Sequence, residues 1–529
     1  MRFRKWMLVL MLTLFCLPSV VPAAKAQSAA IQIFLDGGKL SSDVSPYILP
    51  KVNVTMVPTR VISQGLGASI QWNQQSKTAT ISQPGYTLSL TSGKNTALVN
   101  GKPQPLSASV QIKNGRVMVP LRFISENLGL TVVWNQREKV IDLTSGWIIP
   151  GPVVPGTPQQ PAPDRNEVRG AWISTVYNLD WPANKSSIDR QQSDFTTMLD
   201  QLQDAGINAV FVQLRPSGDA LYTSALVPWS KVLTGTQGKD PGYDPTAFMV
   251  EETHRRGMEF HAWFNPFRAN TELSTASLAP NHVARAHPDW ILSVNKQLMI
   301  DPGNPAARQH IIDTIMEVAN GYDVDGIHLD DYFYPSHTSI PDTTSYRLYN
   351  DGSYKSVGDW RRGNINTFVK ELGESINRTK PNIYYGVSPF GVWRNQSADP
   401  TGSDSKAGVT AYDSMYADTR TWIQNGWIDY IVPQIYWSMD YSAADYDKLV
   451  DWWAKEVRGT GVDLLIGHAA YKVGDKNQDK NWQSAVEIIN QLRYNEKYPD
   501  IEGSIFFRAK HLTGNPLGLL NQLKLYYTS

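Results

Sequence analysis

The chain of 529 residues is too long for one small fold, and at about 150 residues per domain it predicts several units or one large barrel with a smaller companion. Its 49 basic and 49 acidic residues give a formal net charge of zero, which argues against a protein that binds nucleic acid by neutralising phosphates. With 41% hydrophobic and 19% charged residues the chain is typical of a globular protein, and its 17 Trp and 24 Tyr supply flat rings suited to stacking on sugars.

Residues 1–26 have the three parts of a secretory signal peptide. Basic residues precede an apolar stretch over 6–17, and a small-x-small cleavage site follows at 24–26. The apolar run is shorter than the ~20 residues of a membrane-spanning helix, so we expect cleavage and no membrane span afterwards. Cleavage would remove four basic residues and the only cysteine, Cys16, leaving a slightly acidic chain without disulfides or thiolate metal sites. The sequence therefore predicts a secreted or cell-wall-associated protein.

An eleven-residue pattern occurs twice with an offset of 62: VPTRVISQGLG at 57–67 returns as VPLRFISENLG at 119–129, and Trp72 returns as Trp134. Each copy predicts a short helix ending at glycine, then two strands joined by a turn. This pattern resembles the copper amine oxidase-like N-terminal repeat of bacterial surface proteins, and we assign it to residues 27–143. The module contains no His or Cys, so no copper site is expected. A spacer or wall-adhesion role is the main interpretation, with the repeated Trp in the core; glycan binding through it is the alternative.

A proline-rich linker over 144–166 is predicted to separate this domain from a second unit, residues 167–529. There, eight strand-like runs alternate with amphipathic helical stretches, which predicts an α/β fold, the (β/α)8 barrel. The expected strands cover residues 169–175, 209–215, 259–265, 325–331, 384–389, 429–437, 463–469 and 503–508. The expected helices cover residues 194–205, 306–319, 365–376, 443–457, 482–494 and 517–527. A doubly wound sheet is the alternative, but the chain lacks its glycine-rich phosphate turn.

Period-two alternation predicts which side chains point into the barrel at the C-terminal ends of the strands, where barrel enzymes hold their active sites. These side chains are Gln213, Arg215, His261, Trp263, Asn265, His328, Asp330, Ser388, Gln434, Tyr436, His468, Phe506 and Arg508. Branched apolar residues normally fill a barrel interior, and burying so many polar groups without a ligand is costly. The pattern therefore predicts a binding site.

The strongest motif is DGIHLDDY at 325–332, a strand that ends in two carboxylates. Glycoside hydrolysis uses one ionised and one protonated carboxyl group, and we assign the ionised role to Asp330. Its charge is expected to be maintained by Arg215, Arg508 and His328.

The acid stays open among Asp331, Asp440, Asp219 and Glu272, of which Asp331 and Asp440 complete the predicted catalytic set. Adjacent strand residues point to opposite faces, which argues against Asp330 and Asp331 forming the pair between them.

Four blocks of the second unit resemble the glycosyl hydrolase-like family 10 barrel: RGAWI at 169–173, DGIHLDDYFYP at 325–335, SPFGVWR at 388–394 and PQIYW at 433–437. The resemblance spans roughly residues 167–515. It implies glycoside hydrolysis, with the glycan strands of cell-wall peptidoglycan as the substrate class.

We expect no cofactor and no metal. Sugar platforms are expected at Trp172, Trp263, Trp393 and Trp437. The predicted substrate-binding set is Gln213, Arg215, Trp263, Asn265, His328, Ser388, Trp393, Gln434, Tyr436, Trp437, His468 and Arg508.

Two other functions remain open. His261, His328, His468 and Asp330 would suit a metal that activates water, although the first strand lacks the His-x-His of amidohydrolase barrels. The third possibility is a non-catalytic barrel whose ring of polar residues recognises glycan without a catalytic acid.

Overall fold

The computed structural model divides into two compact units, Met1–Thr157 and Pro158–Ser529. The residues that it describes are 31–35, 38–40, 44–49, 54–59, 69–83, 86–121, 123–124, 130–135, 139–145, 167–185, 187–331 and 333–528. The predicted signal peptide, residues 146–166 of the predicted linker and most of the two predicted repeat helices lie outside these residues.

The N-terminal unit contains three sheets with the strand orders β12-β13-β1-β2, β10-β11-β4-β3 and β5-β6-β7-β8-β9. The strands are β1 (Gln32–Leu35), β2 (Gly38–Leu40), β3 (Tyr47–Leu49), β4 (Val54–Pro58), β5 (Ser69–Asn73), β6 (Thr78–Gln83), β7 (Tyr86–Thr91), β8 (Thr96–Val99), β9 (Lys102–Pro105), β10 (Gln111–Lys113), β11 (Arg116–Pro120), β12 (Leu130–Asn135) and β13 (Val140–Ser145). The two sequence copies meet where β4 and β11 pair antiparallel, with Val57 opposite its repeat partner Val119. The predicted strand-turn-strand that follows each repeat is present as β5-β6 and β12-β13.

Trp72 corrects the expectation that the repeated tryptophan belongs to the core. Its side chain is 39% exposed, and its indole Nε1 donates a hydrogen bond to Gln74 Oε1 at 2.7 Å. The side chain of Trp134 lies outside the described part of the chain. The apolar core of this unit consists instead of residues such as Ile81, Leu88 and Leu90.

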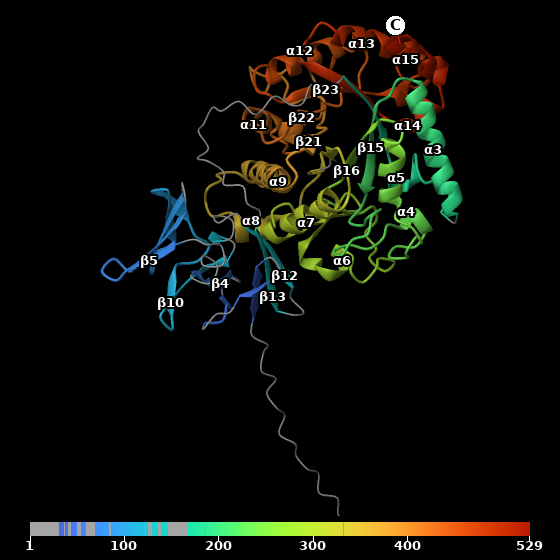
Figure 1. Ribbon diagram of the computed structural model, residues 1–529. Helices are drawn as coiled ribbons and strands as arrows, with labels where there is room; N and C mark the ends of the chain where they lie inside the picture. Colours follow the sequence, from blue (N-terminus) through green and yellow to red (C-terminus); the bar gives the residue numbers. More distant parts are fainter. Residues whose placement is uncertain are drawn as a thin grey trace, which may run out of the picture. The chain divides into compact units, whose positions relative to one another are not determined.

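Eight parallel strands form the predicted closed barrel in the second unit (Figure 1). In order around the barrel they are β14 (Val168–Ile173), β15 (Ala209–Arg215), β16 (Glu259–Phe264), β20 (Gly326–Leu329), β21 (Tyr384–Val387), β22 (Tyr430–Ile431), β23 (Asp463–His468) and β24 (Ile501–Phe506). Pairing of β14 with β24 closes the barrel. The sixth strand is much shorter than predicted, and beyond it Gln434 still forms isolated bridges with Phe390 and Gly467 of the two neighbouring chain segments.

Helices surround these strands, as Figure 1 shows. The longer ones are α3 (Ile188–Asp204), α5 (Pro245–His254), α7 (Pro305–Gly321), α9 (Val357–Thr379), α12 (Tyr446–Val457), α13 (Val486–Asn495) and α15 (Leu519–Thr528). The shorter ones are α4 (Lys231–Thr234), α6 (Val283–Ala286), α8 (Thr343–Tyr349), α10 (Ala411–Ser414), α11 (Thr419–Gln424) and α14 (Ala509–Thr513). A small sheet of β17 (Arg268–Asn270), β18 (Ile291–Val294) and β19 (Gln297–Ile300) is inserted after β16.

Local sequence explains where the helices begin. The side chain of Asn304 accepts hydrogen bonds from the first amides of α7, and Pro305 supplies the preset φ of a first helical residue. A capping side chain followed by proline also starts α5, where Asp244 is the cap; the hydrophobic pattern alone did not predict this helix. The reason is that both faces of α5 contain buried residues, so its apolar positions show no clear stripe.

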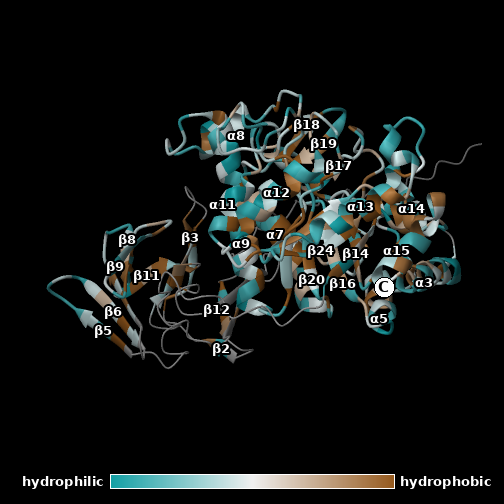
Figure 2. Ribbon diagram, turned by 90° about the horizontal axis from the view of Figure 1, so that it is seen from above, coloured by the Kyte–Doolittle hydropathy of each residue, from teal (hydrophilic) through white to brown (hydrophobic). Residues whose placement is uncertain are grey.

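Two apolar layers stabilise the barrel. The larger lies between strands and helices, and the smaller fills the interior with residues that include Phe211, Tyr430, Leu465 and Ile505. Figure 2 shows hydrophobic residues on the barrel strands and on helices around them. Each large apolar side chain so buried contributes about 1.5–3 kcal/mol to stability. The aromatic interior forms a rigid base beneath the polar strand ends.

Candidate active site

Asp330 lies directly after β20 and is 3% exposed. One of its carboxylate oxygens, Oδ2, accepts a hydrogen bond from Trp263 Nε1 at 3.2 Å and another from Asn265 Nδ2. N–H donors aimed at one oxygen favour the ionised form of a buried carboxyl group. Trp263 and Asn265, both predicted at the site, therefore act on Asp330 directly.

The amide of Asn265 is itself held by Gln213. Gln213 Nε2 donates to Asn265 Oδ1, which leaves the Asn265 NH2 group to face Asp330. Gln213 Oε1 accepts the backbone N–H groups of Thr175 and Val176, both at 2.9 Å. Gln213 is thus a positioning residue that connects the loop after β14 to the carboxylate.

His328 lies inside the barrel in a hydrogen-bonded aromatic cluster. Trp172 Nε1 donates to His328 Nε2 at 3.1 Å, so this nitrogen carries no proton, and Nδ1 lies 3.0 Å from the hydroxyl of Tyr430. The hydroxyl of Ser388 lies 3.0 Å from the same Nε2. Burial and the neighbouring His261 lower the pKa of His328 well below its ordinary value, so the ring is neutral. The expectation that His328 supplies positive charge to Asp330 is therefore wrong.

Asp331 is in a different environment from its neighbour. Burial raises the pKa of the Asp331 carboxyl group, while a hydrogen bond from Gln434 and the positive charge of Arg268 oppose the shift. Gln434 Nε2 also donates to the main-chain oxygen of Ser388 at 2.9 Å, which ties the rims of β21 and β22 together. The strand β20 ends at Leu329, so strict alternation does not extend to Asp331 and the argument against pairing it with Asp330 loses its basis.

Arg268 was not predicted as a site residue because it lies beyond the third strand, in the inserted sheet, where barrel periodicity gives no signal. Its position three residues after Asn265 was the only indication in the sequence.

Arg215 and Arg508 make contacts that the sequence did not predict. Arg215 Nη1 donates to the main-chain oxygens of Asn265 and Pro266, both at 3.0 Å, and so holds the chain where it leaves β16. Arg508 Nη1 forms an ion pair with Asp180 Oδ1 at 2.7 Å. Arg508 therefore joins β24 to the loop after β14 at the closure of the barrel.

Replacement of Arg508 by Met is expected to lower the free energy of unfolding by about 3–5 kcal/mol, because it leaves the buried Asp180 carboxylate without its partner. Urea denaturation measures this change. Lys524→Met is the matched control, since Lys524 pairs with Asp204 on the surface and its loss is expected to cost about 0–1 kcal/mol. Equal effects of the two variants would contradict a structural role for Arg508.

His468 does not point into the barrel as predicted. Its Nδ1 lies 2.9 Å from Gln491 Oε1 of α13 and its Nε2 lies 3.0 Å from Ser504 Oγ of β24. The interior position on this strand belongs to Gly467, where even a Cβ atom would approach the Trp172 ring to 3.2 Å. Phe506, also predicted inside, stacks on His468 in the outer layer. The alternation on the last two strands is therefore opposite to the predicted one.

Burial lowers the pKa of His468 to about 4, so the folded protein keeps this ring neutral while the unfolded chain takes up a proton below pH ~6.5. Its contribution to stability is present above pH ~6.5 and is lost as the pH falls toward 4, by about 1.4 kcal/mol per pH unit. We expect His468→Gln to reduce the slope of unfolding free energy against pH between 6.5 and 5. Urea titrations at several pH values measure the slope. An unaltered slope in His468→Gln would disprove the assignment.

The remaining predicted residues differ in accessibility. Trp393 is only 5% exposed, stacks on Trp452 at 5.6 Å and is covered by the guanidinium of Arg420, so it is a packing residue and not an open sugar platform. Tyr436 and Trp437 are half-buried on the rim after β22.

Two of the predicted acid candidates lie on the surface. Asp440 is exposed, and its backbone N–H donates to Asp445 Oδ1 at 2.9 Å. Glu272 is exposed beside Lys231 at 3.5 Å. Both carboxyl groups are therefore open to solvent.

The predicted metal set does not come together. His468 lies in the outer layer, and His261 and His328 are both engaged by the Tyr430 hydroxyl, at 3.3 and 3.0 Å. Within the described ranges, no group of three or more His, Cys, Asp or Glu side chains is arranged to hold a metal ion.

Comparison with protein families supplies the identification. The family model of glycosyl hydrolase-like 10 matches residues 167–484. The chain belongs to this family. A model of the copper amine oxidase N-terminal domain matches residues 34–143.

Two curated relatives are described as glycosyl hydrolases. Glycosyl hydrolase YngK from Bacillus subtilis (strain 168) is 49% identical over 364 residues, which cover 68% of this chain and 71% of the relative. Glycosyl hydrolase DigH from Escherichia coli (strain K12) is 42% identical over 381 residues, which cover 68% of this chain and 86% of the relative. The family and these relatives show that this member of the glycosyl hydrolase-like 10 family is a glycoside hydrolase.

Solved structures with a similar fold include the PgaB (BpsB) glycoside hydrolase domain from Bordetella bronchiseptica, with 13% identity, a TM-score of 0.43 and coverage of 68% of this chain and 98% of that one. The catalytic domain of beta-amylase from Paenibacillus polymyxa is also similar, with 13% identity, a TM-score of 0.45 and coverage of 68% and 96%.

In the described part of this chain, no helix combines the length and apolar character needed to cross a membrane.

Proposed function

We propose that this protein hydrolyses glycosidic bonds in the glycan strands of peptidoglycan, as a secreted or cell-wall-associated enzyme, with Asp330 as the ionised carboxylate and Asp331 as the acid. One observation carries the assignment of roles: the two adjacent carboxyl groups differ in their contacts. Two N–H donors favour the charged form of Asp330, whereas burial raises the pKa of Asp331. Glycosidases separate an acid from a negatively charged group in this way.

The chemistry follows from these two environments. Asp331 donates its proton to the leaving glycosidic oxygen as the bond from that oxygen to the anomeric carbon breaks, and the negative charge of Asp330 stabilises the positive charge that develops at this carbon. A water molecule then bonds to the anomeric carbon, and the proton that it releases restores the acid. Asn265 and Trp263 hold Asp330 in place, so that little reorganisation is needed in the transition state. Gln434 remains hydrogen-bonded to Asp331 after proton transfer and stabilises the carboxylate that forms.

The choice of peptidoglycan rests on the resemblance of the barrel blocks and on the export signal predicted at residues 1–26. The matched N-terminal domain supports it, because an exposed Trp72 suits adhesion to a glycan surface better than a core role.

The decisive experiment is product analysis after incubation with purified peptidoglycan, with and without its stem peptides. We expect new reducing ends and shortened glycan strands. Binding without products would favour a glycan-binding barrel, and activity that a chelator abolishes and zinc restores would favour metal-dependent hydrolysis. Either result would overturn the proposal.

Secretion is tested separately. Protein isolated from the culture medium or the cell wall is expected to begin at Gln27, as determined by N-terminal sequencing. Recovery of the full chain in the cytoplasm alone would contradict this part of the proposal.

A further inference from the structure

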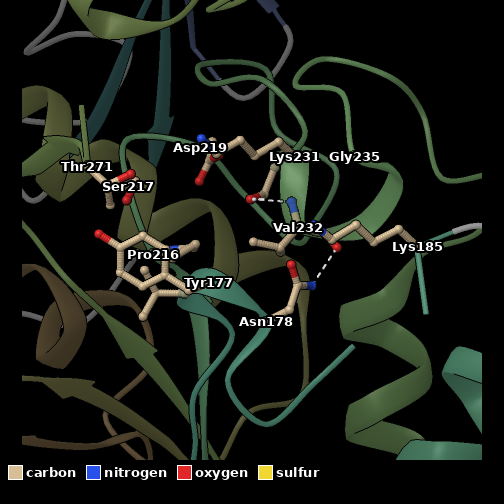
Figure 3. A pocket seen from close by; sticks show the side chains of 12 residues that line it. Tyr177, Asn178, Lys185, Pro216, Ser217, Asp219, Lys231, Val232, Gly235 and Thr271 are labelled. Carbon is tan, nitrogen blue, oxygen red and sulfur yellow. Dashed lines mark hydrogen bonds between the residues drawn. The ribbon is translucent and has the colours of Figure 1, made fainter. Parts of the chain in front are cut away.

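A cavity of about 260 Å³ lies at the same end of the barrel as Asp330, outside the group of residues described above. Residues 176–178 after β14 and residues 216–219 after β15 form two of its walls, and the segment around α4 forms a third (Figure 3). Its size is just below the range of ~300–1,000 Å³ typical of small-molecule sites.

The cavity wall contains two buried polar groups with unused hydrogen-bonding capacity. Asp219 is 2% exposed; its Oδ2 accepts a hydrogen bond from Gln237 Nε2 at 3.1 Å, while its Oδ1 has no hydrogen-bond partner. The Ser217 hydroxyl is also buried and unpartnered. Unsatisfied buried polar atoms are uncommon in native proteins because each costs free energy. A ligand that enters the cavity with hydroxyl groups would satisfy both.

An aromatic ring stands at the same cavity and is fixed in a strained position. Tyr177 is 64% exposed and has a φ of +54°, a conformation that costs a non-glycine residue of order 1–3 kcal/mol. Its neighbours hold it there: the Val176 N–H donates to Gln213, and Asn178 Nδ2 donates to the main-chain oxygens of Pro182 and Val232 at 2.8 and 2.9 Å. An exposed, preorganised ring suits stacking on a ligand rather than packing in a core.

The groups around the cavity argue against a metal cation as its ligand. Lys185 and Lys231 in the wall repel a metal cation, and burial raises the pKa of the Asp219 carboxyl group, which favours its uncharged form. The exposed ring of Tyr177, with the unpartnered polar atoms of Ser217 and Asp219, suits a ligand that has hydroxyl groups and one flat apolar face, which is the chemistry of a sugar ring.

We propose that this cavity is a second sugar-binding site, which holds a neutral sugar residue of the glycan chain at a distance from the bond that is cleaved. The inference rests on the proposed function for its substrate class. The cavity and Asp330 share one hydrogen-bonded network, because Val176 in the cavity wall is bound by Gln213, which orients Asn265 toward Asp330. A chain bound at Asp330 thus has a preformed contact for a further residue at Tyr177.

The test compares Tyr177→Asn and Ser217→Ala with the parent protein, all with Asp330→Asn so that the ligand stays intact. Asn tolerates a positive φ, so the first variant removes the ring and keeps the backbone. Leu517→Asn is the matched control, since Leu517 has a φ of +50° and is 57% exposed. Calorimetry measures binding of the neutral N-acetylglucosamine hexamer and dimer, and of inorganic phosphate and magnesium alone.

We expect both variants to bind the hexamer about tenfold more weakly, because each loses one good contact with the sugar. Their affinity for the dimer should be unchanged. The control should bind both sugars like the parent. Three results would overturn the inference. They are unchanged hexamer affinity in both variants, no hexamer binding by the parent, and binding of phosphate or magnesium that depends on Asp219. Hydrolysis that survives Asp330→Asn would overturn the proposed function instead, while a loss of hexamer binding in the variants would still support the cavity.

Discussion

Asp330→Asn is expected to abolish hydrolysis of glycan strands, with a loss in kcat of about 10³-fold or more, because the variant removes the negative charge opposite the anomeric carbon. The amide has nearly the same shape, and its oxygen still accepts hydrogen bonds from Trp263 and Asn265. Release of reducing ends from peptidoglycan measures the loss. Thermal unfolding and binding of glycan are expected to stay close to those of the wild type.

Asp200→Asn is the matched control for this result. Asp200 lies on α3, its side chain is 64% exposed, and it pairs with Arg256 at 2.7 Å. The control should retain nearly full activity, since an exposed ion pair contributes only about 0–1 kcal/mol to stability. Full activity in Asp330→Asn would remove Asp330 from the mechanism.

Asp331→Asn is expected to lower kcat on natural glycan strands by about 10²–10⁴-fold, the usual contribution of a general acid. A nitrophenyl glycoside should be much less affected, because its leaving group departs without a proton. The contrast between the two substrates is the measurement. Similar losses on both substrates would contradict the role of acid.

The pH profile tests the same assignment independently. Because burial raises the pKa of Asp331, the group stays protonated to a higher pH than an ordinary aspartate, and wild-type kcat falls as the pH rises through that pKa. This alkaline limb should be absent from Asp331→Asn. In Gln434→Leu it should move to higher pH, because the hydrogen bond from Gln434 lowers the pKa of Asp331. An alkaline limb that stays in place in both variants would assign it to another group.

The amino-acid sequence determined the large-scale organisation of this protein. The 62-residue offset predicted the N-terminal repeat, and the pairing of Val57 with Val119 shows the two copies in contact. Apolar runs of strand length between amphipathic helices predicted the eight-stranded barrel, because the spacing of apolar residues is a local property of each segment. The strand ending in Asp330 was found for the same reason, with Trp263 and Asn265 in phase beside it.

Only the tertiary structure decided which polar groups meet. Arg508 pairs with Asp180, 328 residues earlier in the chain, and such a partner is invisible to any local pattern. Leu465 and Gly467 take the interior positions of β23, so the same alternation turns His468 outward toward Gln491 and Ser504. Burial raises the pKa of Asp331, and the two side chains that oppose this shift, Gln434 and Arg268, lie far from it in the sequence. Periodicity predicts which face of a regular strand each side chain occupies. It does not extend past the last residue of the strand, and the candidate catalytic residues of this barrel lie at the strand ends.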